Sequence, residues 1–241
     1  MRTRALASLG AAAVGLAAAA PAAPAAKPPP KVHQLVVFRD GSDRQGTVKA
    51  SAVHVHVGGR KCTVGAATAL AALVRSKPPK LRLHDYGSCS SHARDAAGLF
   101  VRAIGPDANK GQDGWVYKVR HRAATAGAAD PAGPFGNGRL KNGSRVTWFY
   151  CHMNAKNHSC QRTLDLATKS PAPGQLRVHV TAYDDRGKGK PSTGATVHAG
   201  ALTATTDLHG DATFALPPGK VSVFAEKSGA IRSFTTKASV G

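Results

Sequence analysis

Acidic residues are scarce in this chain of 241 residues, and glutamate occurs only once, as Glu226. A hydrolase that works through a pair of glutamates is therefore excluded. The adjacent aspartates Asp184 and Asp185 stand in a turn-like stretch, where solvated carboxylates are expected. The chain also lacks a G-x-S-x-G, an H-E-x-x-H, a Walker motif and a G-x-G-x-x-G after a strand. With no catalytic signature present, we expect no enzyme activity and no cofactor.

Long apolar runs are also lacking, apart from one at the N-terminus. Arg2 and Arg4 precede the apolar residues 5–20, and small residues follow, which is the layout of a secretory signal peptide. The run is shorter than the about 20 residues that a transmembrane helix needs. We predict a signal peptide over residues 1–25 and a secreted, extracellular mature protein with no transmembrane segment.

Cysteine is present in a small even number, as Cys62, Cys89, Cys151 and Cys160. Export places these residues in an oxidising environment, where an even set predicts disulfides. Four cysteines allow three pairings. We favour Cys62 with Cys89 and Cys151 with Cys160, because each pair then encloses a single local unit.

The stretch YCHMNAKNHSC at 150–160 has a second interpretation, as a zinc site formed by Cys151, His152, His158 and Cys160. Its spacing differs from that of zinc fingers, whose paired ligands stand two to four residues apart on each side of a longer loop. If Cys151 continues a strand, His152 points to the opposite face. We favour a loop closed by a disulfide and expect no metal, with a metal-binding protein as the alternative.

The stretch HDYGSCSSHARD at 84–95 contains residue types that a hydrolase uses: Asp85, Ser88, Ser90, Ser91 and His92. Members of a catalytic triad normally converge from distant positions in the sequence. We therefore favour a polar loop fixed by its cysteine, and a hydrolase built on this loop is the alternative.

Positive charge is abundant: the chain has 33 lysines and arginines against 13 aspartates and glutamates. Residues 27–169 contain 23 basic and 8 acidic residues, whereas residues 170–241 contain 8 and 5. A strongly cationic exported domain favours anionic partners such as a cell-wall polymer or lipid headgroups, without specific recognition of nucleic acid. The alternative is that the scattered charge reflects genome composition and only maintains solubility.

Proline-rich stretches divide the chain. PAAPAAKPPPK predicts an extended linker over residues 26–33, and KSPAPGQ predicts a second linker over 169–174. These stretches give a first domain at 34–168 and a second domain at 175–241.

The first domain shows a mixed pattern of strands and one helix. Apolar positions from Val64 to Val74 recur at helical spacing after Thr63, which can cap the helix, and Pro78 ends it. In SAVHVHV (51–57) the valines should face the core and the histidines the other side. Further strands are expected at 34–39, 81–86, 97–105, 115–119 and 145–151. The pattern predicts an α+β domain with a mixed sheet over one helix.

Two stretches of this domain, GQDGWVYKV and LKNGSRVTWFY, resemble the transcobalamin C-terminal-like domain, a β-grasp module of exported bacterial proteins. The resemblance covers about residues 50–152, and Arg120-His121 stands where that family usually has Asn-Gly. It rests on Gly114, Trp115, Tyr117, Val119, Gly143, Val146, Trp148 and Tyr150.

The resemblance implies a β-grasp fold and raises the question of a small-molecule ligand. The aromatic side chains that would line a pocket are Trp115, Tyr117, Trp148 and Tyr150, and core packing is the alternative role for the tryptophans. Basic residues crowd the end of the same strand: Lys118, Arg120 and Arg122.

The second domain reads as short strands separated by turns, which predicts a small all-β sandwich. GATVHAG, TTDLHGDATFAL and PPGKVSVFAEKSG resemble the carboxypeptidase regulatory-like modules of the immunoglobulin-like group. That resemblance implies a spacer or adhesive unit without catalysis.

Together these features predict an exported, non-enzymatic binding or structural protein. Its cationic β-grasp-like module would contact an anionic cell-envelope component or a small ligand, and an immunoglobulin-like β-sandwich would follow.

Overall fold

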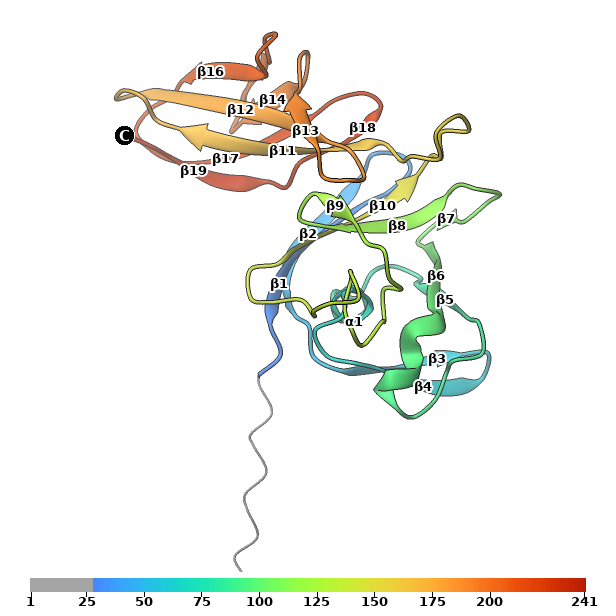
Figure 1. The fold of residues 1–241 in the computed structure, drawn as a ribbon. Helices are drawn as coiled ribbons and strands as arrows, with labels where there is room; N and C mark the ends of the chain where they lie inside the picture. Colours follow the sequence, from blue (N-terminus) through green and yellow to red (C-terminus); the bar gives the residue numbers. More distant parts are fainter. Residues whose placement is uncertain (1–27) are drawn as a thin grey trace, which may run out of the picture.

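The computed structural model describes residues 28–241 (Figure 1). The predicted signal peptide and the start of the predicted linker lie outside the described residues. Strand accounts for 48% and helix for 6% of the structure, and the strands form several small sheets. The prediction of an α+β β-grasp domain followed by an immunoglobulin-like sandwich is therefore wrong, because the fold is mostly β.

The first unit of the chain consists of one central sheet, two smaller sheets and two short helices. Its elements are β1 (Lys31–Val37), β2 (Asp43–Lys49), β3 (Val53–Val57), β4 (Arg60–Val64), α1 (Ala69–Arg75), β5 (Arg82–Asp85), the 3-10 helix η1 (Ala93–Gly98), β6 (Leu99–Ile104), β7 (Asp107–Ala108), β8 (Gly114–Val119), β9 (Arg122–Ala123) and β10 (Arg145–Cys151).

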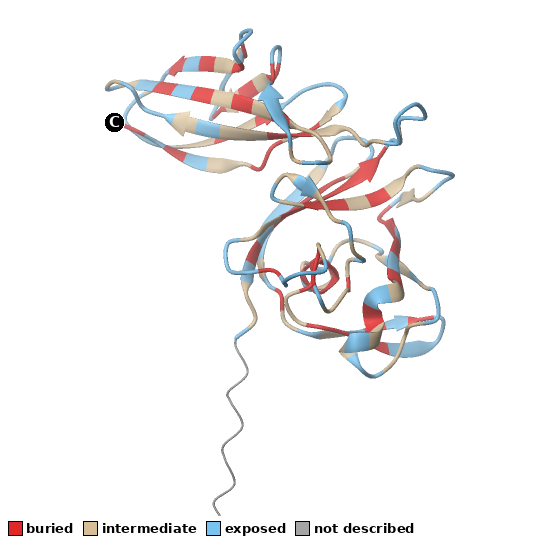
Figure 2. Cartoon of the chain, in the orientation of Figure 1, coloured by how far each residue is buried: buried red, intermediate tan, exposed pale blue. Residues whose placement is uncertain are grey.

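The central sheet has the strand order β2-β1-β10-β8-β9, with β1 and β10 parallel and the other pairs antiparallel. Every residue of β10 from Val146 to Cys151 is buried (Figure 2). Successive side chains of a strand point to opposite faces, so both faces of this sheet are covered. Trp148 packs into the core of the first unit, whereas Phe149 faces the second unit.

The helix is shorter than predicted and begins later. Thr63 does not cap it but lies in β4, which pairs with β3. The cap is Thr68, whose hydroxyl accepts a hydrogen bond from the amide of Ala71 at 3.2 Å, and Ala67 before it has a left-handed φ of 61°. Residues 60–64 pair with β3, and the left-handed Ala67 cannot continue a helix, so only seven residues are helical. Within residues 28–241, no helix has the length and apolarity needed to cross a bilayer.

The hairpin of β3 and β4 follows the predicted alternation. Val55 and Val57 are buried, and His54 and His56 are exposed. The two strands are joined by a two-residue turn of glycines with φ values of 56° and 78°, the conformation that such hairpin turns require.

The second unit consists of strands alone. They are β11 (Arg162–Lys169), β12 (Gln175–Tyr183), β13 (Gly189–Pro191), β14 (Thr196–Ala199), β15 (Leu202–Thr205), β16 (Asp211–Ala215), β17 (Gly219–Glu226), β18 (Ala230–Ile231) and β19 (Thr236–Val240). One sheet has the order β13-β12-β11-β18, with β16 also paired to β12, and the other has the order β15-β14-β17-β19. Buried residues of both sheets, Val178, Val197, Phe214 and Val223 among them, share one core.

The predicted linker at 169–174 begins with the last residue of β11, and residues 170–174 form the turn of a hairpin. β11 pairs along its length with β12, from Thr163 opposite Tyr183 to Lys169 opposite Arg177. β11 therefore belongs to the second unit, which begins near residue 162. The prolines and the glycine of the turn resemble a linker in composition, although they connect two paired strands.

The second unit lies against the outer face of the central sheet (Figure 1). Leu35 and Phe149 of this face form an apolar cluster with Ile231 and Phe234 of the second unit. Polar contacts surround the cluster. Gln45 exchanges two hydrogen bonds of 2.7 Å with the backbone of Thr235, and Arg232 forms an ion pair with Asp43.

This pairing predicts which C-terminal fragment folds. A fragment of residues 161–241 should show a cooperative thermal transition and a β-type circular dichroism spectrum, because it keeps β11 beside β12. A fragment of residues 175–241 should lack the transition, because it loses β11 and the buried side chain of Leu164. Equal folding of the two fragments would contradict the assignment of β11 to this unit.

Candidate functional site

The predicted ligand residue Lys118 lies between the two units and has no exposed surface. Its Nζ lies 3.1 Å from Oδ1 of Asp185 and 3.1 Å from the carbonyl oxygen of Asp184, both in the turn after β12. Burial lowers the pKa of Lys118, and the neighbouring carboxylate of Asp185 opposes this shift only in part. Lys118 therefore fixes the second unit to β8 and is not available to a ligand at the surface.

A second group of polar contacts lies beside this pair. Asp165 of β11 accepts a hydrogen bond of 3.0 Å from Arg145 of β10, and its other oxygen lies 3.6 Å from Nε2 of His121. The His121 ring stacks on Tyr183 with centroids 3.7 Å apart, and burial lowers the pKa of His121. These contacts hold the turn between β8 and β9 against the second unit.

Next to this turn lies a cleft of about 510 Å³, bounded by the turn, by residues 134–144 and by the turn after β12. Five exposed basic side chains line it: Arg120, Arg122, Arg139, Lys141 and Arg186. The lining contains no aspartate or glutamate. Within residues 28–241, none of the five takes part in an ion pair, so the cleft concentrates uncompensated positive charge. We call it the cationic cleft.

Two backbone features shape the cationic cleft. Arg120 has a φ of 56°, a left-handed conformation that glycine adopts more easily, at the first position of the two-residue turn between β8 and β9. Gly187 has a φ of 81°, and a Cβ at this position would lie 2.7 Å from Cγ of Arg122. The absence of a side chain therefore lets Arg122 lie against the second unit, where it forms a backbone bridge with Arg186.

The four predicted aromatic residues are buried, with exposed fractions between 1% and 8%. Three of them donate hydrogen bonds to backbone carbonyls. Trp115 bonds to Asp107 at 2.8 Å, Tyr117 to Ala126 at 3.0 Å and Tyr150 to Ala108 at 3.0 Å. Trp115, Tyr117 and Trp148 line a separate apolar cavity, and Tyr150 does not. The prediction thus assigned four aromatic residues to one pocket, although only three of them line the same cavity.

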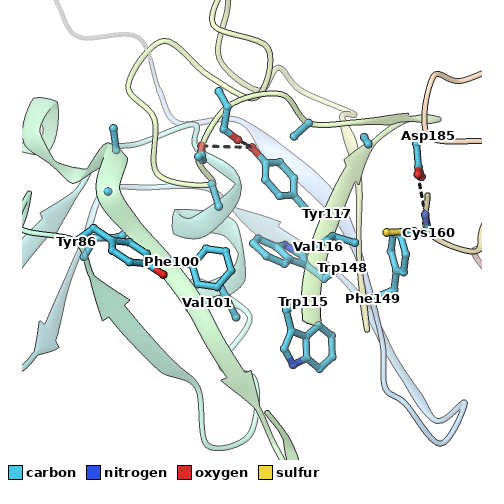
Figure 3. A pocket seen from close by; sticks show the side chains of 18 residues that line it. Tyr86, Phe100, Val101, Trp115, Val116, Tyr117, Trp148, Phe149, Cys160 and Asp185 are labelled. Atoms are coloured by element: carbon cyan, nitrogen blue, oxygen red, sulfur yellow. Dashed lines mark hydrogen bonds between the residues drawn. The ribbon is translucent and has the colours of Figure 1, made fainter. Parts of the chain in front are cut away.

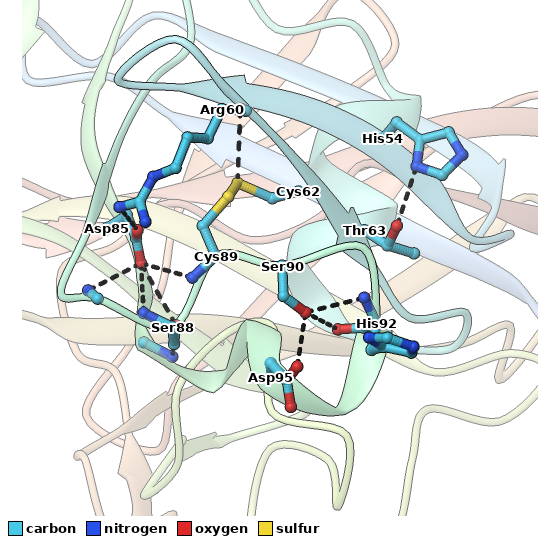
Figure 4. Close-up of a disulfide and its surroundings, with 12 residues drawn as sticks. His54, Arg60, Cys62, Thr63, Asp85, Ser88, Cys89, Ser90, His92 and Asp95 are labelled. Carbon is cyan, nitrogen blue, oxygen red and sulfur yellow. Dashed lines mark hydrogen bonds and ion pairs between the residues drawn. A yellow bond between two sulfur atoms is a disulfide. The ribbon is translucent and has the colours of Figure 1, made fainter.

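The 84–95 loop is held by its own hydrogen bonds (Figure 4). Asp85 accepts hydrogen bonds from the amides of Gly87, Ser88 and Cys89 and pairs with Arg60 at 2.8 Å. Burial raises the pKa of Asp85, but these amides and the guanidinium outweigh it and hold the pKa below its usual range. The carboxylate is thus occupied in shaping the loop.

The serine and histidine candidates of this loop are not arranged as a triad. Ser90 donates a hydrogen bond to Asp95 at 2.5 Å and accepts one from the amide of His92. Ser91 lies 3.4 Å from Nδ1 of His92, but Asp85 contacts neither of them. The disulfide between Cys62 and Cys89 links the loop to β4. This is the pairing that the sequence analysis favours.

The 150–160 loop is closed by the Cys151–Cys160 disulfide, so neither sulfur is available as a thiolate ligand. His152 lies 3.0 Å from Asp113, which also accepts a hydrogen bond from the amide of Met153. The hydrogen bond from this amide, followed by that from His152, lowers the pKa of Asp113. Among residues 28–241, no group of three or more histidine, cysteine, aspartate or glutamate side chains is placed to hold a metal ion.

Comparison of the chain with protein-family models, with curated proteins and with solved structures gives no match. The resemblances to the transcobalamin C-terminal-like and carboxypeptidase regulatory-like modules therefore stay predictions.

Sequence reasoning found Arg120 and Arg122 of the cationic cleft but missed Arg139, Lys141 and Arg186. One signal was available, because no acidic residue occurs between Asp130 and Asp165. Nothing in the sequence indicates that Arg186 of the second unit joins this group, because its position depends on how the units pack.

The buried ion pair predicts a stability effect. Lys118→Met should lower the free energy of unfolding by about 2 to 4 kcal/mol, because it leaves the Asp185 carboxylate half-buried without its cation. The double variant Lys118→Met/Asp185→Asn should recover part of this loss. The control is Lys220→Met at an exposed position of β17, and denaturant titration measures all three. A loss no larger than that of the control would contradict the role of Lys118.

Proposed function

We propose that this protein is an exported binding protein that holds an anionic, phosphate-bearing polymer of the cell envelope in the cationic cleft. One observation carries the proposal: five exposed cationic side chains line the cleft, and no carboxylate lines it. Among residues 28–241, none of the five has an ion-pair partner. Guanidinium groups form paired hydrogen bonds with phosphate oxygens, and four of the five side chains are arginines. The two disulfides support an oxidising, extracellular location.

The position of the charges supports this function over a general role in solubility. Residues 28–161 carry 20 lysines and arginines against 7 aspartates, yet many of these side chains are spread over the surface. In the cationic cleft, two cations from different units, Arg122 and Arg186, stand opposite each other in a backbone bridge. Like charges placed opposite each other repel, so an anion between them relieves a cost that scattered charges do not have.

The test uses a glycerol-phosphate teichoic acid as the probe and measures its affinity over a series of salt concentrations. Arg122→Gln, Arg139→Gln and Arg186→Gln should each weaken binding about tenfold at low salt. Each should also reduce the slope of log affinity against log salt by about one, because fewer counterions are released.

The matched control is Arg82→Gln, which removes the same charge from an exposed position of β5 outside the cleft. It should leave affinity and slope nearly unchanged. If Arg82→Gln weakens binding as much as the cleft variants do, net charge alone explains the binding and the proposed site is wrong.

The strained turn gives a second test of the same site. Arg120→Gly should weaken binding, while the free energy of unfolding stays constant or rises by about 1 kcal/mol, because glycine adopts a left-handed φ without strain. Arg120→Gln should weaken binding to the same extent and bring no gain in stability. Unchanged polymer binding in both variants would exclude Arg120 from the site.

A further inference from the structure

A second cavity, of about 300 Å³, lies between β6 and β8 (Figure 3). Leu99, Phe100 and Val101 form one wall, and the side chains of β8 form the other. The two strands belong to different sheets, so no strand pairing fills the space between them. At one end Asn109 bridges them, because its side chain donates to the Val101 carbonyl at 3.0 Å and accepts from the Trp115 amide at 2.8 Å.

The third wall consists of very small residues in the stretch 123–128, which reads AATAGA. The hydroxyl of Tyr117 donates to the carbonyl of Ala126 and so fixes this stretch over the cavity. Gly127 cannot be enlarged, because a Cβ there would lie 2.5 Å from the carbonyl oxygen of Ala97. Small side chains at these positions leave open a space equal to about ten water molecules.

Exposed aromatic rings stand among the lining residues. Only four large hydrophobic side chains are exposed among residues 28–241, and two of them, Tyr86 and Phe100, line this cavity. Their ring centroids are 6.3 Å apart (Figure 3). Exposed aromatic groups that cluster at a cavity are typical of a binding site.

One polar group of the lining lacks a partner. Trp148 is 1% exposed, and its indole nitrogen has no hydrogen-bond acceptor among residues 28–241. Buried indole N–H groups usually have an acceptor. The one carboxylate of the lining, that of Asp185, is already paired with Lys118. The indole nitrogen is itself enclosed by protein atoms and cannot be reached from the cavity, so the lining favours an apolar ligand without net charge.

We propose that this cavity binds a neutral, planar aromatic molecule, which packs against the exposed rings of Tyr86 and Phe100. The exposed rings of Tyr86 and Phe100 and the apolar surface beside the alanines suit a flat ring system. This site has its own lining and ligand, so it does not depend on the proposed polymer binding.

The chain carries its own reporter for this site, because its only two tryptophans, Trp115 and Trp148, both line the cavity. The first probe is N-phenylnaphthylamine, a neutral dye that accepts energy from excited tryptophan. Saturable dye emission on excitation of tryptophan is expected for the full mature chain. Absence of saturable binding would overturn the proposal.

Competition against the dye tests the chemistry of the ligand. Naphthalene and 2-naphthoate share one ring system, but only 2-naphthoate carries a negative charge. Naphthalene should displace the dye at a concentration several-fold lower than 2-naphthoate does, because the lining contains no lysine or arginine. Equal displacement would overturn the preference for a neutral ligand.

Variants locate the site. Ala126→Leu, which fills the cavity, should weaken dye binding at least tenfold, and Phe100→Ala should weaken it several-fold. The control Leu202→Ala truncates a side chain of equal exposure, 45% against 43% for Phe100, in the other unit and should have no effect. Near-ultraviolet circular dichroism and the melting temperature confirm that each variant is folded. Equal dye binding in Phe100→Ala, Ala126→Leu and Leu202→Ala would place the dye elsewhere and overturn the site.

The two proposals fail separately. Arg122→Gln should retain dye binding while polymer binding weakens about tenfold, and Ala126→Leu should retain polymer binding while dye binding weakens. Loss of both activities in a folded Ala126→Leu variant would overturn the independence of the two sites.

Discussion

The arrangement of the two units depends on one buried charge. A lysine with no exposed surface needs a partner, because an isolated ammonium group in a protein interior is very costly. Lys118 finds this partner in Asp185, together with the carbonyl of Asp184. The contact places the turn after β12 against the end of β8. The same turn carries Arg186 and Gly187, so the contact that satisfies the buried lysine also builds one side of the cationic cleft.

The central sheet separates two environments with different chemistry. Its inner face and the small residues at 123–128 form an apolar cavity, and the turn at one end of β8 opens into the cationic cleft. The short strand β9 stands between them, since Ala123 lines the cavity and Arg122 lines the cleft. A two-residue strand thus presents successive residues to an apolar and to a charged space, as the alternation of strand side chains requires.

Local patterns predicted individual elements well and their assembly poorly. The strand 145–151 has the predicted bounds, because its run of apolar and aromatic residues is strong. The helix was predicted too early, because β4 pairs with β3 and Ala67 has a left-handed φ, and apolar spacing shows neither feature. The prolines of the 169–174 turn indicated a linker, since composition does not show that the flanking strands pair. The cationic cleft was predicted only in part, because Arg139 and Arg186 reach it through packing between distant segments.

The backbone bridge between Arg122 and Arg186 has a consequence for how the units hold together. Two guanidinium-bearing residues face each other across the junction of the units, with no carboxylate in the cleft to neutralise them. Their mutual repulsion opposes the attraction between Lys118 and Asp185, but the former is exposed and the latter buried. Mobile ions screen exposed charges over about 8 Å at physiological ionic strength and affect buried pairs much less. We therefore expect ionic strength to act on this junction selectively: added salt should weaken the repulsion between the two arginines and leave the Lys118–Asp185 pair nearly unchanged.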